Sequence, residues 1–223
     1  MEGGRLDLQI ASIEGIDGVI PANQTRSREA QARLMKAGEE VFAQKGYDEA
    51  HVSDIAAAAN CSIGSFYRRF RDKEALFRAL HGQFAQRTRD NFDRFFAMPQ
   101  WEGAPTAEVI KTLVENTARV IQRHPGFFRA LFQRTLAGAR ETYSPALMAA
   151  DAYSGRKLAD FLRGRGEGMT DGLDEACILG LRTVDAALIH RALHSANPAE
   201  DVPVFATDSL SRMLTLFLGV PLR

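Results

Sequence analysis

The sequence from residue 54 to residue 67 reads DIAAAANCSIGSFY, and this stretch decides the fold. Its first half has the composition of a short helix, and its small alanines permit a second helix to cross it closely. Ser62 can accept a backbone N–H from the following turn and so predicts the start of another helix, Ile63 to Phe70. A helix, a tight turn and a second helix in this order predict a helix-turn-helix.

The segments on either side extend this pattern to four helices. Before it, apolar residues recur at helical spacing between Leu34 and Phe42, and Gly46 predicts the end of that first helix. After it, Asp72 predicts the N-cap of a longer helix with an apolar face, which ends at about Phe96. The three short helices are therefore expected to share one core, and the fourth helix to lead away from it.

Glycine and proline divide the rest of the chain into segments of helix length, and no strand-like alternation accompanies them. The breakers are Pro105, the stretch 124–126, Ser144 with Pro145, the glycine-rich stretch 164–172, and Asn197 with Pro198. We therefore predict an all-α protein with three parts along the chain. These are a flexible N-terminal arm over residues 1–25, a helix-turn-helix domain over 26–76 and a larger helical domain over 77–223.

Positive charge is local in this chain. The 28 lysines and arginines balance 28 aspartates and glutamates, so the formal net charge is +0 and no global basic excess announces nucleic-acid binding. On or just after the third helix, however, five basic residues face only Asp72 and Glu74: Arg68, Arg69, Arg71, Lys73 and Arg78. Basic side chains bind phosphates by displacing condensed counterions, so this patch predicts binding to double-stranded DNA.

The start of the third helix carries short side chains. Ser62 and Ser65 leave its N-terminus free to enter the major groove, which is roughly 12 Å wide, and to approach the base edges. Tyr67 places a hydroxyl within reach of a phosphate oxygen. The third helix is therefore the predicted recognition helix.

Residues 28–77 resemble the DNA-binding domain of the TetR (tetracycline-repressor) family of bacterial transcriptional regulators. The resemblance rests on FAQKGY at 42–47, DIA at 54–56, SIGSFY at 62–67, and Phe70 followed by KEALF at 73–77. It implies that Tyr67 and Lys73 bind phosphates, and that Ser53, Ile63, Gly64, Ser65 and Arg68 face the groove. The complete set of predicted DNA-binding residues is Arg28, Ser53, Ser62, Ile63, Gly64, Ser65, Tyr67, Arg68, Arg69 and Lys73.

One position departs from the family pattern. The family usually has Thr or Ser where this chain has Ala50 and His51, and that hydroxyl often caps the second helix and touches a phosphate. His51 is the residue that could replace this contact.

The resemblance also implies a homodimer, in which the last two helices form a four-helix bundle with a partner subunit. Here those helices are expected at about 173–195 and 202–218. The apolar residues predicted to fill the interface are Leu181, Val184, Leu188, Leu210, Met213, Leu214 and Phe217. Such a dimer would hold two recognition helices about 34 Å apart, the spacing of successive major grooves.

An inducible regulator also needs a cavity, which is typically apolar with a few polar groups. The candidate lining residues are Phe92, Phe96, Trp101, His124, Phe127, Phe128 and Phe132. The alternative for these aromatic residues is an ordinary helical core. His124 would orient a ligand at the mouth of the cavity or simply end a helix.

These observations predict a helix-turn-helix DNA-binding domain joined by a long helix to a helical ligand-binding and dimerisation domain. The function they favour is repression of transcription, with release from the operator when a small apolar or amphipathic effector shifts the dimer to a wrong spacing. The fourth helix is the expected pivot. The alternatives are a ligand-independent repressor or an activator of the same fold, a non-specific architectural DNA protein, and a small-molecule enzyme or carrier that bears a DNA-binding domain.

Other classes of function find little in the sequence. The sequence has no pattern that indicates a nucleophile with its base, a catalytic pair of carboxylates or a nucleotide-binding loop. We therefore expect neither enzymatic activity nor a cofactor. His190 and His194 lie one helical turn apart, but no third ligand is evident, so no metal is expected. No apolar run approaches the roughly 20 residues that span a bilayer. The distant Cys61 and Cys177, with no cleavable signal pattern, predict a cytoplasmic protein.

Overall fold

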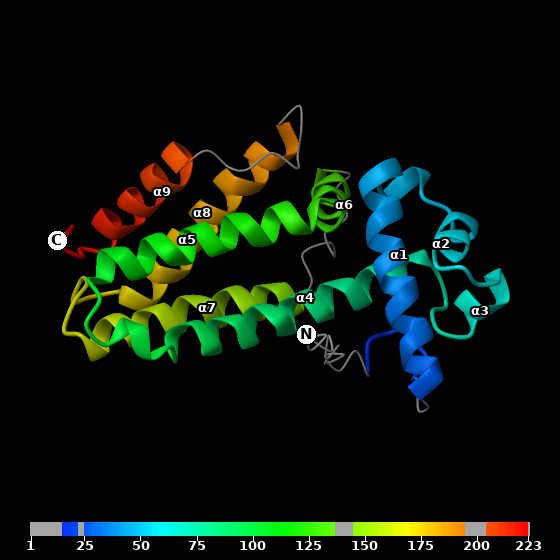
Figure 1. The fold of residues 1–223 in the computed structure, drawn as a ribbon, viewed down its shortest axis with the longest axis horizontal. Coiled ribbons are helices and arrows are strands. Elements are labelled where there is room, and N and C mark those ends of the chain that lie inside the picture. The colour runs from blue at the N-terminus through cyan, green and yellow to red at the C-terminus, as the bar shows by residue number, and fades with distance from the viewer. Residues whose placement is uncertain (1–14, 22–24, 137–144, 195–203, 223) are drawn as a thin grey trace, which may run out of the picture.

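A computed structural model shows an all-α protein whose helix-turn-helix lies at one end of a larger helical domain (Figure 1). Within the described part of the chain the only β-type pairing is an isolated bridge between Val19 and Phe70. The described residues are 15–21, 25–136, 145–194 and 204–222.

Three helices build the helix-turn-helix end: α1 (Thr25–Glu49), α2 (Val52–Ala58) and α3 (Ile63–Tyr67). The helix is interrupted at Gly46, as predicted, because this glycine adopts the non-helical φ of 78°, and a further short helical stretch then runs to Glu49. α3 begins as predicted, with the Ser62 hydroxyl accepting the Ser65 N–H at 3.1 Å. It ends earlier than predicted, because the backbone that follows pairs with residues 18–20.

The fourth helix, α4 (Lys73–Phe96), joins the two parts of the molecule. The Asp72 carboxylate caps it by accepting the Ala75 N–H at 2.7 Å, as the sequence predicted. A short 3₁₀ helix, η1 (Pro99–Trp101), follows its end. Leu76 and Phe77 near its start are buried in the core shared with α1, whereas Phe92 and Phe95 near its end pack in the larger domain.

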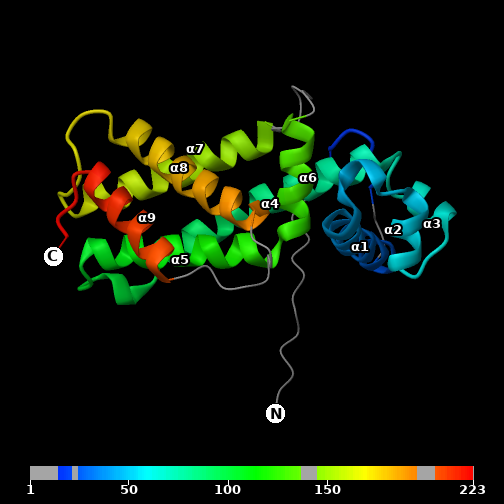
Figure 2. The ribbon, with the colours of Figure 1, turned by 90° about the horizontal axis from the view of Figure 1, so that it is seen from above.

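The larger domain contains five more helices: α5 (Thr106–Arg123), α6 (Pro125–Leu136), α7 (Pro145–Gly164), α8 (Leu173–His194) and α9 (Val204–Phe217). α4 lies along α7, α7 along α8, and α5 along α9 (Figures 1 and 2). Two glycines permit the closest approaches, since a Cβ on Gly155 would lie 2.8 Å from the Ile178 Cα and one on Gly180 would lie 2.5 Å from Leu214 Cδ1.

Within the larger domain, α6 is the helix that faces the helix-turn-helix, and it packs along α1 (Figure 1). The Tyr47 N–H donates to Gln133 Oε1 at 2.9 Å, and His124 Nδ1 lies 2.7 Å from Glu39 Oε1. At Gly126 the two helices touch without a side chain between them, because an added Cβ would lie 2.2 Å from the Glu39 carbonyl oxygen. The two parts of the molecule are thus in direct contact through α6 as well as joined by α4.

Residues 15–21 differ from the expected flexible arm, because they are held against the helix-turn-helix. The Ile20 N–H donates to the Arg69 carbonyl at 2.8 Å, and the Arg71 N–H donates to the Gly18 carbonyl at 2.8 Å. The Asp17 carboxylate pairs with the Arg71 guanidinium at 2.9 Å. These are long-range contacts, which short apolar pieces without periodicity do not reveal in a sequence.

His81 on α4 is a buried histidine without a polar partner. It is 2% exposed, and its two ring nitrogens have no hydrogen-bond partner within the described parts of the chain. Its ring packs against Phe77 at 4.3 Å and Phe127 at 5.5 Å between centroids. Burial lowers the pKa of His81 to about 4, so the imidazole is neutral in the folded protein near pH 7.

We expect the free energy of unfolding to fall by about 1 to 2 kcal/mol between pH 7 and pH 5 on account of His81. The unfolded chain takes up the proton below pH 6.5, whereas the folded chain resists it down to about pH 4, so protons favour unfolding in this window. Urea unfolding of His81→Leu at both pH values should lack this part of the slope. His51→Gln, which alters an exposed histidine, should retain it, and an equal slope in both variants would contradict the assignment.

Candidate nucleic-acid interface and candidate effector cavity

α3 turns one face to the core and the other to solvent. Phe66 is fully buried and packs against Phe70 at 5.6 Å between ring centroids. Ile63 and Tyr67, in contrast, are 49% and 51% exposed, and Arg68 is also exposed. Because Phe66 anchors the helix from below, the exposed face is presented on a rigid support.

The exposed face is open at its N-terminal end. A Cβ built on Gly64 would meet only the Ser62 hydroxyl, at 3.9 Å, so packing within the protein does not require a glycine there. Ser62 is exposed and Ser65 is half-buried beside Gly64. A double helix could therefore approach the backbone of α3 closely at this point.

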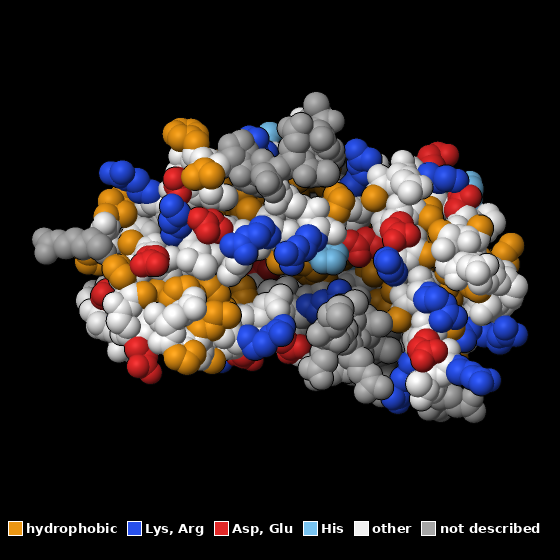
Figure 3. Space-filling model, viewed as in Figure 1, with side chains coloured by type: hydrophobic (Ala, Val, Ile, Leu, Met, Phe, Trp, Pro, Cys, Tyr) orange, Lys and Arg blue, Asp and Glu red, His pale blue; other side chains and the backbone are white. Residues whose placement is uncertain are grey.

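Arg68 is the strongest candidate for a base contact, because it is exposed and its side chain makes no hydrogen bond or ion pair to the described parts of the chain. Ser53 on α2 and Arg28 on α1 are also exposed, and they come from the two other helices of the helix-turn-helix end. Figure 3 shows lysine and arginine side chains gathered at the end that carries α1 and α3.

Arg69 and Lys73 have partners inside the protein. Arg69 donates to the Ser65 carbonyl at 2.8 Å and to the Ser27 carbonyl at 3.3 Å, which ties α3 to the start of α1. Lys73 donates to the Tyr47 carbonyl at 2.6 Å and to the Asp48 carbonyl at 3.2 Å, which caps the end of α1. Burial lowers the pKa of both groups. A phosphate would have to share these cations with main-chain carbonyls.

Two further arginines of the predicted basic patch are paired with an acidic side chain. Asp17 lies 2.9 Å from Arg71 and 3.4 Å from Arg78, and its pKa is lowered chiefly by the hydrogen bond from Arg71. The patch is therefore less positive than five basic residues in sequence suggested.

The structure caps α2 without a hydroxyl. The Asp54 carboxylate accepts the His51 backbone N–H at 3.1 Å and also pairs with Lys45 at 2.9 Å. The hydrogen bond from Lys45 lowers the pKa of Asp54. This contact is the half of a capping box that satisfies the N–H of the N-cap residue, whereas the family's Thr or Ser would accept an N–H from the first turn of the helix.

The larger domain encloses a cavity of about 450 Å³ among α4, α5, α6, α7 and α8. Phe84 and Phe92 line it from α4, and Phe127 and Phe128 line it from α6. The Phe84 and Phe127 rings stack at 4.8 Å between centroids. This size falls within the roughly 300 to 1,000 Å³ that is typical of small-molecule sites.

Four of the seven predicted lining residues lie outside this cavity. Trp101 is buried and donates its indole N–H to the Phe95 carbonyl at 2.6 Å, whereas Phe96 packs on Phe161 at 4.9 Å. His124 contacts Glu39 of α1, and Phe132 is 39% exposed. An aromatic pattern locates a helix face, but which face meets a cavity depends on the neighbouring helices.

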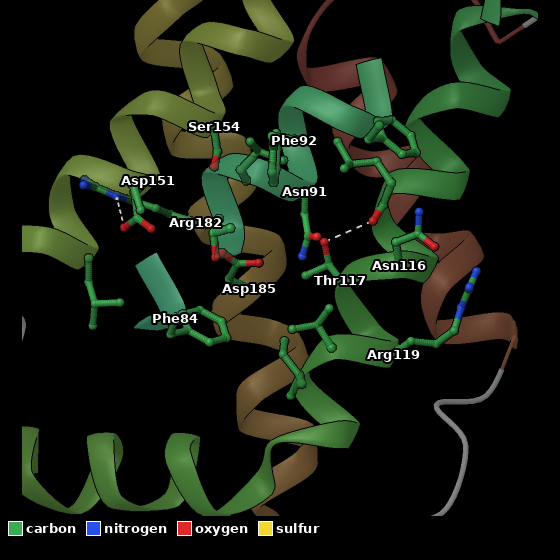
Figure 4. A pocket seen from close by; sticks show the side chains of 18 of the residues that line it. Phe84, Asn91, Phe92, Asn116, Thr117, Arg119, Asp151, Ser154, Arg182 and Asp185 are labelled. Atoms are coloured by element: carbon green, nitrogen blue, oxygen red, sulfur yellow. Dashed lines mark hydrogen bonds and ion pairs between the residues drawn. The ribbon is translucent and has the colours of Figure 1, made fainter. Parts of the chain in front are cut away.

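Polar residues of the cavity were not identified from the sequence. Ser154, Asp151 and Asp185 lie on α7 and α8, across from Asn91 and Thr117 on α4 and α5 (Figure 4). Asp151 pairs with Arg182 at 3.2 Å. The only sequence signal for Asp185 was a carboxylate in the otherwise apolar VDAALI stretch of residues 184–189.

The residues predicted for the dimer interface separate into two groups. Leu181, Val184, Leu188 and Leu214 are buried within the chain's own core. Leu210 is half-buried, while Met213 and Phe217 are 40% and 43% exposed. Further exposed apolar side chains on α8 and α9 are Leu179, Phe205 and Leu216.

Two further observations concern the described residues alone. None of their helices is long and apolar enough to cross a membrane. His190 and His194 stack at 4.4 Å between ring centroids, and no group of three His, Cys, Asp or Glu side chains able to hold a metal occurs in the described ranges.

Comparison with known proteins identifies the same end of the molecule. Residues 34–80 match the family of bacterial regulatory proteins named tetR. The HTH-type transcriptional regulator YdgC of Bacillus subtilis is 36% identical over 66 residues, which are 30% of this chain and 34% of that protein. The HTH-type transcriptional repressor DhaR of Mycobacterium sp. strain GP1 is 48% identical over 43 residues, 19% of this chain and 22% of that protein. The matched stretch therefore spans only about a third or less of these relatives.

The similarity of fold extends much further. A crystal structure of a protein from Mesorhizobium loti, assigned to the TetR-family transcriptional regulators, has a TM-score of 0.70 at 18% identity and covers 88% of this chain and 100% of the other. The fold and the exposed third helix together define an all-α helix-turn-helix protein. Residues 34–80 are similar to the tetR family of bacterial regulatory proteins, and the chain as a whole has the fold of the TetR-family regulator from Mesorhizobium loti.

Substitutions on α3 should separate general from base-specific binding. Tyr67→Phe removes an exposed hydroxyl and should weaken binding to every DNA sequence by a similar factor, whereas Arg68→Ala should cost roughly 1 to 3 kcal/mol at one base position. Titration of the variants with matched and singly altered duplexes measures both effects. Arg119→Ala on α5 is the control, and unchanged binding in both α3 variants would contradict the orientation of the recognition helix.

Proposed function

We propose that this protein is a DNA-binding repressor of transcription that acts as a cytoplasmic homodimer and is released from its operator by a small molecule. The observation that carries the proposal is the exposed, rigidly supported face of α3, with Gly64 open to approach and Arg68 without a partner in the described chain. In this proposal residues 26–76 bind DNA, residues 77–223 bind the effector and the partner subunit, and the protein has no catalytic role.

The dimer interface in this proposal is the exposed face of α8 and α9. Leu179, Met213, Leu216 and Phe217 are each at least 40% exposed, although they are large and apolar. Exposed apolar side chains on neighbouring helices are typical of an interface between subunits. A two-fold axis through this face would place one recognition helix on each side of the dimer.

α6 is the element that can transmit the effector's presence to α1. Phe127 and Phe128 contribute to the cavity, and Gly126 lies against the α1 backbone. A ligand that displaces the two phenyl rings would therefore move α1 relative to the larger domain, in addition to any movement of α4. Such a ligand favours one of two arrangements of the dimer by its differential affinity for them.

Selection from a random-sequence DNA library should yield two inverted half-sites about one helical turn apart. Sedimentation of the complex should show a dimer on each site, and a reporter gene placed behind the selected sequence should be repressed. Selection of no sequence above random DNA would contradict the proposal and favour an architectural protein. Activation of the reporter would contradict the proposed repressor role but not the proposed DNA binding.

Gly126→Ala should lower operator affinity by about tenfold, a change of ~1.4 kcal/mol. The new Cβ would lie 2.2 Å from the Glu39 carbonyl oxygen and 2.9 Å from the Ala43 nitrogen, so α6 and α1 must separate. Gly164→Ala is the matched control, because nothing lies within 4 Å of its Cβ position. Equal operator affinity in the two variants would show that the α6–α1 contact does not govern DNA binding.

A further inference from the structure

The cavity contains one carboxyl group that lacks a charge partner. Asp185 lines the cavity from α8, and its carboxyl group makes no hydrogen bond or ion pair to the described parts of the chain. The neighbouring Asp151 differs, because Arg182 pairs with it at 3.2 Å. The nearby Ser154 hydroxyl is buried and has no hydrogen-bond partner in the same ranges. One side of the cavity thus carries polar groups whose bonding capacity the protein does not use.

A half-buried carboxylate without a cation is costly, because it loses part of its hydration and gains no charge partner in return. Burial first, and the negative charge of Asp151 second, raise the pKa of Asp185 to about 7. A positive charge placed beside this carboxyl group would remove that cost, so the group prefers a cationic neighbour from outside the chain.

The surroundings of Asp185 suit a cation with an apolar body. Phe84, Phe92, Phe127 and Phe128 line the same cavity, and the Phe84 and Phe128 rings meet edge to face at 5.4 Å. Aromatic faces attract a cation through the ring quadrupole and also bury hydrocarbon. A carboxylate next to phenyl rings therefore recognises the two halves of an amphiphilic cation.

The arginines that line the cavity do not offer an equal site for an anion. Arg94, Arg119 and Arg123 are exposed, so water screens their charges. Arg94 donates to Asn91 Oδ1 at 2.7 Å, and Arg119 lies 3.8 Å from Glu115. An anionic ligand bound to these side chains would still leave Asp185 without a partner.

We propose that the cavity binds a cationic amphiphile, a protonated amine or a quaternary ammonium, with its charge beside Asp185 and its apolar body among the phenylalanines. The inference rests on the proposed function only in treating this ligand as the effector. Binding of the cation itself does not depend on DNA.

The test compares three probes of equal chain length on the full-length protein by calorimetry, each below its micelle concentration: decyltrimethylammonium, decanoate and decanol. The cation should bind most tightly to the wild-type chain. Asp185→Asn should lower the affinity for decyltrimethylammonium by about tenfold or more, because it removes one partner of the charge pair. The affinity for decanol should change by less than about twofold. Asp160→Asn, which removes an exposed carboxylate of α7, is the control for net charge and should change neither.

A pH series gives a second readout that a folding defect would not mimic. The charge of decyltrimethylammonium is fixed, so its affinity for the wild-type chain should rise from pH 6 to pH 8 as Asp185 ionises, and should stay constant in Asp185→Asn. The other charged groups of the cavity are Asp151 and four exposed arginines, Arg94, Arg119, Arg123 and Arg182, and the lining contains no histidine. His81 behind Phe127 stays neutral over this range, because its pKa is about 4.

Tighter binding of decanoate than of the cation, equal cation affinity in wild type and Asp185→Asn, or no binding of any probe at millimolar concentration would each overturn the inference. Cation binding that depends on Asp185 in a protein that selects no DNA sequence would support the inference and contradict the proposed function. The two proposals therefore fail separately.

Discussion

The packing around Phe77 is the contact on which the rest of the structure depends. This residue of α4 is 1% exposed and meets Phe42 at 5.7 Å, Tyr47 at 5.1 Å and His81 at 4.3 Å between ring centroids. Phe77 also lies 6.4 Å from Phe127, which itself lines the cavity. One side chain thus connects the core that supports the helix-turn-helix to a residue of the cavity wall. Since interiors are closely packed, a change on one side of this cluster cannot be absorbed without a change on the other.

Internal ion pairs and hydrogen bonds occupy most of the cations near the proposed DNA surface. Arg71 and Arg78 are paired with Asp17, and Arg69 and Lys73 are bonded to main-chain carbonyls. Arg68 is left as the exposed cation on α3 without such a bond in the described chain. The internal pairs stabilise the conformation of this surface and add little to its positive electrostatic potential. A protein with zero net charge can therefore still present a local surface for phosphate and base contacts.

Much of the helix-turn-helix was predictable because its signals are local. The Ser62 and Asp72 caps each act within three residues, and the sequence placed both correctly. The faces of α8 were not predictable in this way. Both are apolar or small, with Leu181, Val184 and Leu188 on the buried face and Leu179 on the exposed one, so helical periodicity does not tell the core from a free surface. For the same reason four aromatic residues were expected at the cavity and lie elsewhere.

The sequence by itself determined the all-α class, the helix order, the Ser62 and Asp72 caps and the position of the third helix, because each depends on residues that are neighbours along the chain. Only the tertiary structure decided where the cavity lies, that Asp185 lines it without a partner, and that residues 15–21 hold the helix-turn-helix. These features arise where segments distant in sequence meet. Their burial and charge balance are properties of several helices at once, which no local pattern records.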